Sequence, residues 1–498
     1  MSDLVVAVFP LTGGPVPDLP TLTSSSGGPD SPSRRTVAVV GGGFTGLLAA
    51  RQLRAEGADV LLLEASERMG GQIRTVPVAG VPVDVGAEAM HLAAPGTAEL
   101  LDELDLTESM VAARTGRSWL VTPRGLRPLP AGVGPAGPTR LRPVVRSRVM
   151  TVPGMARAGL EPLLVRSGRV PTLEAGEDVS VGEFVAGRFG RQVVERFVDP
   201  LLGGLHAGDV RRLSLRACAP ALVPAAGSGR SLLVRRRPGA AGRMSFVSWP
   251  EGLGRVVDRL VEELGATVRT GSAVTDLARE GRRWRLRTSD GATHVVDGVV
   301  LAVGAAVAAE LLAPRSPTAA EQLRATRRAD VATVLLALPR AAVADAPALA
   351  GTGMLVPSTT GSTLKAATFL STKWAHLDLD DTVLLRLSAG RADGPRLPSD
   401  DEELVDRLRA DLAGFTGIGA DPVQVHVERW PSALPQLTVG HPARLAAARE
   451  ALADDAPGVE LAGSSYDGLG LTSCAASARR AVDRLHDHLT PTKTKEPA

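Results

Sequence analysis

The sequence has 498 residues, 44% of them hydrophobic and 22% charged, which is typical of a globular protein built from two or three sub-domains. Its 56 basic and 54 acidic residues leave a net charge of +2, which argues against a nucleic-acid binder driven by phosphate neutralisation. The two cysteines, Cys218 and Cys474, belong to no C-x-x-C pair or Cys/His cluster, so the sequence predicts no metal site, iron–sulfur centre or redox-active disulfide.

Both ends of the sequence are polar. Residues 1–34 are predicted to be a disordered leader, rich in Pro, Gly, Ser and Thr from about Leu11 onward, and residues 490–498 a flexible tail. The short apolar patch near the start follows an acid rather than a basic cluster, so we expect no signal peptide. No apolar run reaches the roughly 20 residues that a transmembrane helix needs, and we expect a cytoplasmic protein.

The first ordered stretch is predicted to be a β-strand, a helix and a second β-strand. Residues 37–40 form a continuous β-branched and apolar run, which is typical of a buried parallel strand. A glycine-rich break follows, and "LLAARQLRAEG" then has helical spacing up to the stop at Gly57. The segment "ADVLLLEA" is predicted to be the next buried strand, which completes a βαβ unit.

The break between strand and helix has the pattern Gly41-x-Gly43-x-x-Gly46. In a dinucleotide site the first glycine allows a tight turn, the second lets backbone approach a pyrophosphate, and the third permits close helix–strand packing. The helix that follows offers free N–H groups and the positive end of its dipole to phosphates. Glu64 ends the second strand 18 residues later (64 − 46), where an acid accepts hydrogen bonds from ribose hydroxyls.

A second glycine pair indicates which dinucleotide is bound. In "ERMGGQIRT", Gly70 and Gly71 follow the ribose acid and would let more backbone approach an extended cofactor, while Arg68 could reach a phosphate. A transiently bound NAD has no need of this second contact, whereas a permanently held FAD does. We therefore predict FAD as the cofactor.

The middle of the chain mixes helices, loops and short strands. The segment from Ser180 is predicted to begin with a capping box completed by Glu183. It continues as one amphipathic helix with a buried face at Phe184, Val185, Val193, Val194, Phe197 and Leu201. Further on we predict a helix over 254–264, a strand over 267–270, and a meander made of "VTDLARE", "RRWRLRT" and "THVVDGVVLAV".

These elements predict an α/β fold with a Rossmann-like FAD-binding domain, containing a parallel sheet and a β-meander, a mixed-sheet substrate-binding domain and a helical insertion. The expected domain ranges are 35–90, 243–310 and 455–489 for the FAD-binding domain, 91–242 for the mainly helical insertion, and 311–454 for the substrate-binding domain.

The residues Glu64, Arg68, Gly70, Gly71 and Thr75 fit the pattern E-x-x-x-R-x-G-G-x-x-x-T/S, which resembles the signature of the flavin amine oxidase superfamily. Within it, the chain from about Arg35 to Leu489 resembles the protoporphyrinogen and coproporphyrinogen oxidases of Gram-positive bacteria. The stretches that carry this resemblance are "VDVGAEA", "FVDPLLGGLHAGDVRRLSLRA", "ATFLSTKWAH", "RWPSALPQLTVGH" and "GLGLTSCAAS".

Carried over by position, the resemblance implies a set of FAD contacts spread along the chain. They are Gly41, Gly42, Gly43, Phe44, Thr45, Gly46, Glu64, Ala65, Arg68, Gly71, Gln72, Gly86, Ala87, Glu88, Ala89, Val274, Trp430, Ser464, Leu469, Gly470 and Leu471. From the residues alone, Val274 is equally well an ordinary strand residue and Trp430 a core aromatic.

The resemblance implies oxidation of a porphyrinogen, by transfer of a hydride from a bridging carbon to the flavin and loss of a pyrrole proton. Propionate side chains of such a substrate call for basic residues, and Arg211, Arg212, Arg216 and Lys373 are candidates, although each could equally be a solvated surface charge. His91 could help with a proton or be structural, and no catalytic residue is assigned. No Ser/His/Asp or paired-carboxylate arrangement is evident, and this chemistry does not require a strong general base.

The expected function is oxidation of coproporphyrinogen III to coproporphyrin III, with O2 as acceptor and H2O2 as product, in haem biosynthesis. The Ala/Arg/Gly/Leu-rich composition resembles that of high-GC Gram-positive bacteria, for which the resemblance implies this substrate and transient contact with other haem-pathway enzymes. Four positions depart from the family pattern, and they are His206, Leu437, Ser464 and Ala478.

Three alternatives stay open. They are oxidation of protoporphyrinogen IX, oxidation of an amine or polyene by a paralogue, and flavin binding without catalysis. A single tyrosine in the chain makes the aromatic cage of an amine oxidase difficult to build. The spacing of the cysteines excludes a pyridine-nucleotide disulfide reductase.

Overall fold

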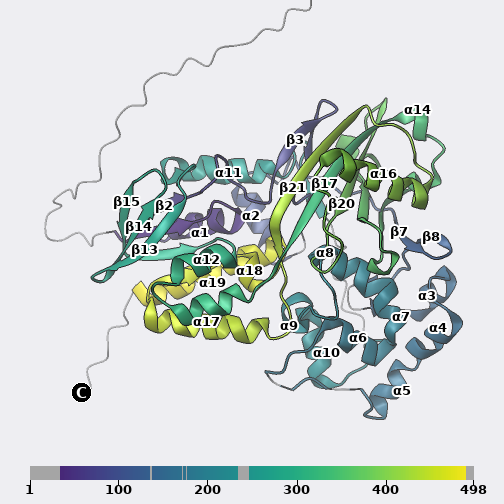
Figure 1. Ribbon diagram of the computed structural model, residues 1–498, viewed down its shortest axis with the longest axis horizontal. Coiled ribbons are helices and arrows are strands. Elements are labelled where there is room, and N and C mark those ends of the chain that lie inside the picture. Colours follow the sequence, from purple (N-terminus) through teal and green to yellow (C-terminus); the bar gives the residue numbers. More distant parts are fainter. Residues whose placement is uncertain are drawn as a thin grey trace, which may run out of the picture. The chain divides into compact units, whose positions relative to one another are not determined.

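The protein is described by a computed structural model over residues 34–92, 94–134, 137–170, 172–174, 176–233 and 246–489. The tail predicted for residues 490–498 and, apart from Arg34, the leader predicted for residues 1–34 lie outside the described residues. Figure 1 shows two sheets, one at the left and one at the upper right, with a group of short helices below the second.

The first sheet is parallel and contains the predicted βαβ unit. Its strands, in order across the sheet, are β12 (Val268–Arg269), β2 (Asp59–Leu63), β1 (Thr36–Val40), β16 (Gly298–Leu301) and β22 (Val459–Leu461). In β1, Val37 and Val39 pack into one hydrophobic core and Ala38 and Val40 into another. Because both faces are covered, the strand has a continuous apolar sequence rather than an alternating one.

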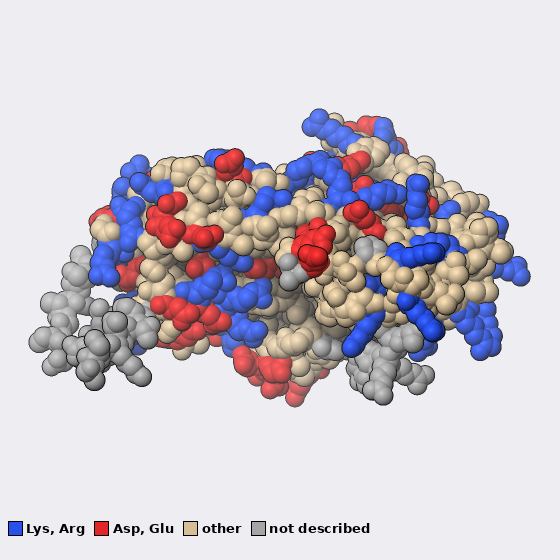
Figure 2. All heavy atoms as spheres, turned by 90° about the horizontal axis from the view of Figure 1, so that it is seen from below, with Lys and Arg blue, Asp and Glu red and all other residues tan. Residues whose placement is uncertain are grey.

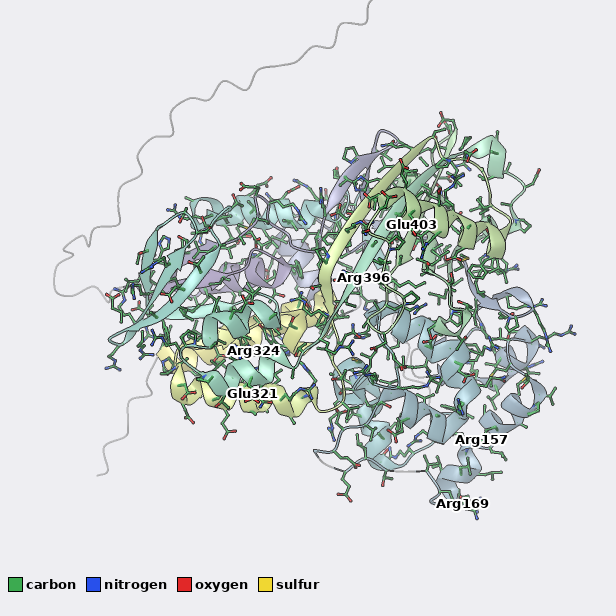
Figure 3. The ribbon with its side chains drawn as sticks, viewed as in Figure 1. Arg157, Arg169, Glu321, Arg324, Arg396 and Glu403 are labelled. Carbon is green, nitrogen blue, oxygen red and sulfur yellow. The ribbon has the colours of Figure 1, made fainter. Side chains whose placement is uncertain are left out.

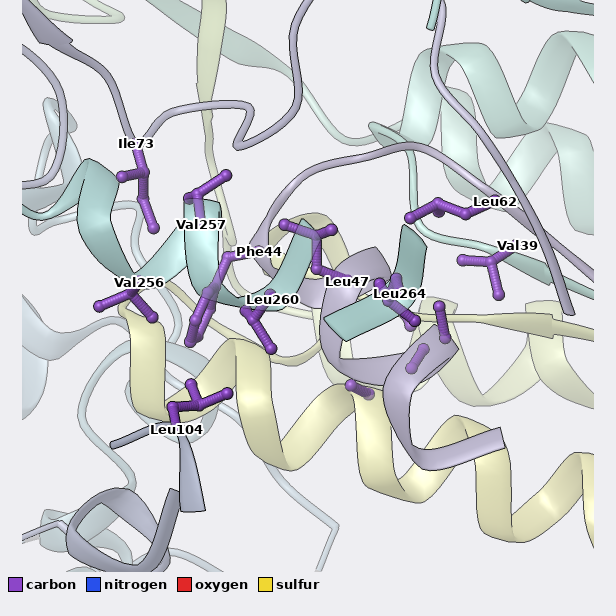
Figure 4. Packing of buried hydrophobic residues seen from close by; sticks show 14 of the residues in the cluster. Val39, Phe44, Leu47, Leu62, Ile73, Leu104, Val256, Val257, Leu260 and Leu264 are labelled. Atoms are coloured by element: carbon purple, nitrogen blue, oxygen red, sulfur yellow. The ribbon is translucent and has the colours of Figure 1, made fainter. Parts of the chain in front are cut away.

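Three helices cover the first face of the parallel sheet: α1 (Phe44–Ala55), α11 (Gly254–Leu264) and α19 (Leu471–Leu489). Figure 4 shows the core between them, where Leu47 and Leu260 from the helices belong to the same cluster as Val39 of the sheet. The helix predicted over residues 254–264 is confirmed. Its apolar residues Val256, Val257, Leu260 and Leu264 all lie on the buried side.

The second face of the parallel sheet packs against an antiparallel meander and three further helices. These elements are β13 (Val274–Glu280), β14 (Arg283–Thr288), β15 (Thr293–Val296), α12 (Ala305–Leu312), α13 (Pro317–Arg324) and α17 (His441–Asp455). The last predicted meander segment divides into two strands, because β16 leaves the meander and pairs with β1. Asp297 causes the change, since its backbone N–H donates to Thr36 O and its carboxylate accepts from Thr36 N.

The second sheet is mixed. Its strands, in order, are β21 (Gln424–Pro435), β17 (Arg328–Pro339), β20 (Thr382–Ala389), β19 (Leu364–Phe369), β18 (Gly351–Leu355), β7 (Arg117–Thr122) and β8 (Gly125–Pro128). Helix α16 (Asp401–Thr416) covers one face, which we call the outer face, through Leu404, Leu408 and Leu412. The opposite, inner face packs partly against the hairpin of β3 (Thr75–Val78) and β4 (Val81–Asp84).

The short helices form a third region with a core of its own. They are α3 (Leu141–Ser147), α4 (Val152–Gly159), α5 (Glu161–Arg166), α6 (Val181–Phe189), α7 (Arg191–Val193), the π-helix η1 (Val194–Gly203), α8 (Gly204–His206), α9 (Leu215–Cys218) and α10 (Val223–Ser228). Cys218 lies at the edge of this core, and its thiol donates to Leu437 O. Ser180 caps α6 as predicted, because its side chain accepts from the Glu183 backbone N–H.

The prediction of one continuous helix from Ser180 is wrong. Gly190 ends α6 with φ of +90°, a conformation that L-residues with a side chain rarely adopt, and the chain then restarts as α7 and η1. Within η1, Pro200 has no N–H to donate and would clash with the carbonyl four residues earlier, and the wider π turn accommodates it. The predicted apolar positions are nevertheless buried, except that Leu201 is only half-buried.

Strands β7 and β8 belong to the range 91–242 predicted to be mainly helical, yet they extend the mixed sheet. Helices α13 and α17 belong to the range 311–454, yet they pack beside the parallel sheet. The chain therefore crosses between the layers more often than the predicted domain ranges imply, and the division into domains stays a prediction.

Charged side chains are not spread evenly over the face that Figure 2 shows. On the face in Figure 2, acidic and basic side chains are interspersed at the left, over the parallel-sheet side, whereas basic ones predominate at the right. Figure 3 places Arg157 and Arg169 among the short helices. No helix within the described ranges is long and apolar enough to cross a membrane.

Candidate flavin and substrate site

The first glycine loop follows β1, and two of its glycines are required by close packing. Gly41 has φ of +106°, and a Cβ there would lie 2.7 Å from Ala302 O. A Cβ on Gly46 would lie 1.9 Å from Gly41 O, which no side chain can occupy. At Gly43 the nearest atom to an added Cβ is 4.0 Å away, so space is left in front of the loop.

That space faces the start of α1. Gly43 is the residue that precedes this helix, and no side chain caps the helix N-terminus. Free N–H groups at a helix N-terminus, together with the helix dipole, stabilise phosphate groups. The close packing at Gly41 and Gly46 and the open space at Gly43 are compatible with the tasks that the sequence predicts for the three glycines, and phosphate binding stays a prediction.

The ribose acid predicted at Glu64 lies at the edge of this loop. Its Oε2 accepts from Gly42 N at 2.6 Å, and its Oε1 accepts from the Ser66 backbone N–H at 2.9 Å and from the Ser66 hydroxyl at 2.8 Å. A Cβ on Gly42 would lie 2.9 Å from the Cβ of Glu64, so a side chain at this position would displace the acid. The carboxylate is thus held beside the glycine loop by backbone donors.

The second glycine pair packs directly against the first loop. Gly70 N donates to Gly42 O at 2.8 Å, and Gly71 lies so near Gly43 that an added Cβ would be 3.1 Å from its Cα. Both Gly70 and Gly71 have positive φ, at +104° and +57°. Two stretches of side-chain-free backbone therefore meet at one place, which is what close approach to an extended cofactor requires.

Arg68 holds the shape of this second turn. Its guanidinium donates to the carbonyls of Met69, Ile73 and Gly71 at 3.3, 3.1 and 2.7 Å. The predicted contact between Arg68 and a phosphate stays a prediction. The bonds that the side chain makes are those of a residue that positions the glycine pair.

Thr75 closes the sequence pattern by anchoring it to a helix. Its hydroxyl donates to Asp84 Oδ1 at 2.6 Å and accepts from Gly254 N, at the start of α11, at 3.1 Å. Asp84 in turn accepts from Leu253 N at 2.9 Å. Burial raises the pKa of Asp84 to about 6, against the opposing effect of these donors. The pattern from Glu64 to Thr75 is therefore fixed at both ends.

Predicted cofactor contacts from three parts of the chain meet beside this turn: Gln72, the segment 86–89 and Trp430. Ala87 N donates to Gln72 O at 2.9 Å, and the Gln72 side chain donates to Ala433 O at 2.7 Å. A Cβ on Gly86 would lie 1.9 Å from Gln72 O and 3.2 Å from the ring of Trp430. The segment 86–89 and Trp430 are thus in one place, as the predicted contact set requires.

Val274 follows a loop that runs beside Glu64. Glu64 N donates to Arg269 O at 2.9 Å, and Ser272 N donates to Glu64 O at 2.8 Å. Two residues further on, Val274 begins β13 and is half-buried against the core of the meander. Its contact with the cofactor stays a prediction.

The C-terminal candidates approach the same loop from the other side. Ser464 begins α18 (Ser464–Asp467), and the preceding Gly463 lies close to Thr45, since a Cβ added to it would be 3.7 Å from the threonine hydroxyl. Leu469, Gly470 and Leu471 lead into α19, with φ of +102° at Gly470. In the first turn of α19, Cys474 hydrogen-bonds with Thr45, and burial raises the pKa of its thiol.

Glu88, within the segment 86–89, belongs to a group of partly buried charges that the sequence analysis did not assemble. Glu88 Oε1 accepts from Lys373 Nζ and from Trp374 Nε1, both at 2.7 Å, and its Oε2 accepts from Arg386 at 2.9 Å. Arg386 also donates to Gly86 O at 2.5 Å. Burial alone would raise the pKa of Glu88, but Lys373 and Arg386 lower it to about 2.

Glu88 was predicted as a cofactor contact and Lys373 as a substrate contact, and the structure pairs the two. Arg386 was missed. Its only signal was a charged residue within the strand "TVLLRLSA", and without the sheet register nothing connects it to Glu88. One carboxylate is shared by two cations, so this group carries a net positive charge beside the predicted flavin segment.

The arginine candidates lie elsewhere. Arg216 donates to the carbonyls of Glu177 and Glu174, and Arg212 pairs with Asp393 at 2.8 Å. Arg211 is half-exposed and lines a cavity of about 270 Å³ whose lining residues all lie outside the mixed sheet. These contacts favour structural or surface roles for the three side chains, and substrate contact stays a prediction.

Neither His91 nor His206 belongs to the charged group around Glu88. His91 pairs through β5 (Met90–His91) with β11 (Phe246–Ser248), and its ring lies 5.4 Å from that of Phe246. His206 is buried, which lowers its pKa to about 4, and its carbonyl accepts from Gln436. Leu437 lies in the core of the short helices, so its departure from the family pattern is a packing difference.

A fold with two glycine-rich backbone stretches at the carboxyl edge of a parallel sheet, and an acid beside them, is typical of a dinucleotide-binding protein. The profile of the flavin containing amine oxidoreductases matches residues 44–486. The coproporphyrinogen III oxidase of Mycobacterium leprae is 36% identical over 91% of this chain and 98% of the relative. That of Bacillus subtilis is 30% identical over the same shares of the two chains.

A crystal structure of a candidate protoporphyrinogen oxidase from Exiguobacterium sp. 255-15 superimposes with a TM-score of 0.79 at 29% identity, covering 91% of this chain and 99% of that one. The chain therefore belongs to the family of flavin containing amine oxidoreductases, in the branch that contains the curated coproporphyrinogen III oxidases. The resemblance and the α/β fold predicted from the sequence are confirmed.

Proposed function

We propose that this protein oxidises coproporphyrinogen III to coproporphyrin III, with FAD as its flavin and O2 as the final electron acceptor. The observation that carries the proposal is the positively charged group of Glu88, Lys373 and Arg386 beside the segment 86–89. A substrate with four propionates is matched by cations at the place where the predicted flavin site adjoins the mixed sheet. The names of the curated relatives support the same substrate.

The choice of FAD rests on the two backbone stretches that meet at Gly43 and Gly71 and on the acid at Glu64. An adenine dinucleotide has two phosphates and a ribose that these groups would bind, whereas a mononucleotide flavin lacks the ribose that the acid would bind. The whole set of predicted contacts from Gly41 to Leu471 belongs to this proposal. Release of the bound flavin by denaturation, followed by chromatography, distinguishes FAD from FMN.

A flavin held at this site would supply a hydride acceptor for a bridging carbon of the macrocycle, with O2 as the final acceptor and H2O2 as its product. The protein's own residues would orient the macrocycle and exclude water. The glycine loops and Trp430 would fix one partner, and the cations of the inner face would fix the carboxylates of the other. Full conversion removes six hydrogen atoms, so three such steps consume three molecules of O2.

The test is porphyrin fluorescence in air, with purified yellow protein and with coproporphyrinogen III and protoporphyrinogen IX offered in parallel. We expect faster formation of coproporphyrin with release of H2O2. Preference for protoporphyrinogen IX would support the first alternative. Flavin that stays bound while neither substrate reacts above autoxidation would contradict oxidation and favour a flavin-binding protein without catalysis.

Oxidation of an amine is disfavoured by the position of the only tyrosine. Tyr466 is 2% exposed and its hydroxyl donates to Val303 O, so it is not free to form the wall of an amine cage. A cytoplasmic location and transient contact with other haem-pathway enzymes stay predictions. Fractionation of cells and cross-linking in extracts would test them.

A further inference from the structure

Strand β19 contains a register shift that turns a lysine toward the inner face of the mixed sheet. Leu364 pairs with Ala389 and Ala366 with Ser388, so β19 uses one more residue than β20 at this point. Leu364 belongs to the outer core, as do Ala367 and Phe369. If side chains alternated strictly between the two faces back from Phe369, Leu364 would point to the inner face. The extra residue in β19 instead places Leu364 on the outer face.

The residue at this bulge is Lys365. It cannot share the outer core with Leu364, and it lies one strand away from Arg386, whose side chain reaches Glu88 on the inner face. Arg386 lies opposite Thr368, three residues from Lys365 along β19, and its charge acts on the Lys365 ammonium. A β-bulge often re-aims a side chain at a functional site.

Lys365 is buried without an anionic partner. It is 7% exposed, and no hydrogen bond or ion pair joins its ammonium to another described residue. The two charged groups that act on it are Arg391 and Arg386, and both are cationic. Together with burial, which is the larger effect, they lower the pKa of Lys365 to about 7.

Arg391 approaches the lysine from the other side. Val356 N donates to Lys365 O at 3.0 Å, and Val356 O accepts from Arg391 at 2.7 Å, so one residue links the two cations. The acid that acts on Arg391 is Asp199, whose carboxylate is occupied by the backbone N–H and hydroxyl of Ser358. Among the described residues, no carboxylate forms an ion pair with Lys365 or with Arg391, although the charge of Asp199 acts on Arg391.

A buried charge without a partner is strongly destabilising, and a chain keeps one where a ligand or a reaction uses it. Resting on the proposed function, we propose that Lys365 and Arg391 form a subsite that binds one carboxylate of the porphyrinogen on the inner face of the mixed sheet. The subsite adjoins Arg386, which contacts the predicted flavin segment through Gly86. A propionate bound there would fix the macrocycle relative to the flavin and would complete the missing counter-charge.

The test compares Lys365→Met with Lys365→Arg in the flavin-loaded protein. Methionine keeps the length and removes the charge, and arginine keeps the charge. We expect Lys365→Met to raise KM for coproporphyrinogen III by about 10- to 100-fold with kcat little changed, because a hydrogen bond to a charged group is lost. Lys365→Arg should recover most of this loss, and the flavin content should stay the same in both variants.

A second readout does not depend on turnover. The Kd of coproporphyrin III, measured by fluorescence, should rise by the same factor in Lys365→Met, whereas that of its tetramethyl ester should not change. The melting temperature of Lys365→Met should rise, since an unpaired buried charge is removed. Arg407→Met on α16 is the matched control, because Arg407 is half-exposed on the outer face and should leave both KM and Kd unchanged.

Unchanged KM and Kd in Lys365→Met would overturn the subsite. A fall in kcat at constant KM, with loss of a basic limb from the pH profile, would instead make Lys365 a proton acceptor and also overturn it. If Lys365→Met does not fold, Lys365→Gln, compared with the wild type for the Kd of coproporphyrin III and of its ester, gives the same decision. If the wild type does not oxidise coproporphyrinogen III, the proposed function fails, yet the change in the Kd of coproporphyrin III between the wild type and Lys365→Met still tests the subsite.

Discussion

The glycine loops and the inner face of the mixed sheet meet at the segment 86–89, but they are built in opposite ways. Around Gly41, Gly46 and Gly70 the chain removes side chains so that backbone can pack and bind. On the inner face the chain buries charges, with one carboxylate shared by Lys373 and Arg386 and with Lys365 left unpaired. The first region depends on the absence of side chains, and the second depends on the charges of its side chains.

This difference predicts how each region responds to substitution. A glycine loop fails when any atom is added, whatever its polarity, because the clash is with backbone. A buried charged group tolerates changes of shape better than changes of charge, because an ion left without a partner is very costly. Volume-conserving and charge-conserving substitutions therefore separate the two regions.

The largest expected effect is that of Glu88→Gln. The substitution keeps the shape but leaves Lys373 and Arg386 without a counter-charge, and we expect it to lower the free energy of unfolding by about 3–5 kcal/mol. Denaturant unfolding measures this change. Glu403→Gln on α16, at the exposed position labelled in Figure 3, is the matched control and should cost less than about 0.5 kcal/mol. An equal loss in both variants would break the comparison.

The same carboxylate should give the protein a stability loss in acid. The pKa of Glu88 is lowered from 4.5 to about 2, so its contribution is fully present above pH 4.5 and is lost as the pH falls through 2. The shift corresponds to about 3 kcal/mol. Unfolding measured between pH 5 and pH 2 should show this loss in the wild type and a shallower one in Glu88→Gln. Parallel curves for the two proteins would mean that other groups dominate.

Gly46→Ala tests the glycine loop. Its methyl group would lie 1.9 Å from Gly41 O, and we expect a destabilisation of about 1–3 kcal/mol together with loss of bound flavin. Gly43→Ala is the informative partner, because its methyl group would meet nothing within 4.0 Å except the Cα of Gly71. It should fold normally and bind flavin more weakly, as measured by flavin absorbance after dialysis. Normal flavin affinity in Gly43→Ala would contradict a cofactor in front of the loop.

The smallest effect is expected for Arg211→Ala. The side chain is half-exposed and lies 3.7 Å from Asp209, so its removal should change stability by less than about 0.5 kcal/mol and leave KM for coproporphyrinogen III unchanged. Steady-state kinetics check this. A large rise in KM would indicate that the substrate binds near the short helices rather than at the inner face of the mixed sheet.

The cofactor side could be predicted because its requirements are local. The pattern from Gly41 to Gly46 follows from the spacing of the glycines, and that from Glu64 to Thr75 from a resemblance to a superfamily signature. The structure brings the two stretches together through the bond from Gly70 to Gly42. The helix at 254–264 was predictable for the same reason, since its apolar spacing is regular and Gly265 ends it.

The inner face could not be predicted, because its members come together only through the sheet register. Arg386 reaches Glu88 only because β20 pairs with β17 and β19 in one alignment. Lys365 faces inward because of the bulge between Leu364 and Ala366, and no short-range sequence pattern predicts that bulge. The continuous helix predicted from Ser180 failed at Gly190, where a left-handed backbone interrupts regular apolar spacing.

The two cysteines give each part of the molecule its own built-in probe of local opening. Cys474 is held against Thr45 beneath the glycine loop, and Cys218 donates to Leu437 O among the short helices. Burial raises the pKa of both thiols, that of Cys218 to about 12, so neither is a ready thiolate while its surroundings are closed. The rate of alkylation of each thiol therefore reports how often its own region opens. A ligand that binds to one region and keeps it closed should slow the alkylation of only the thiol in that region.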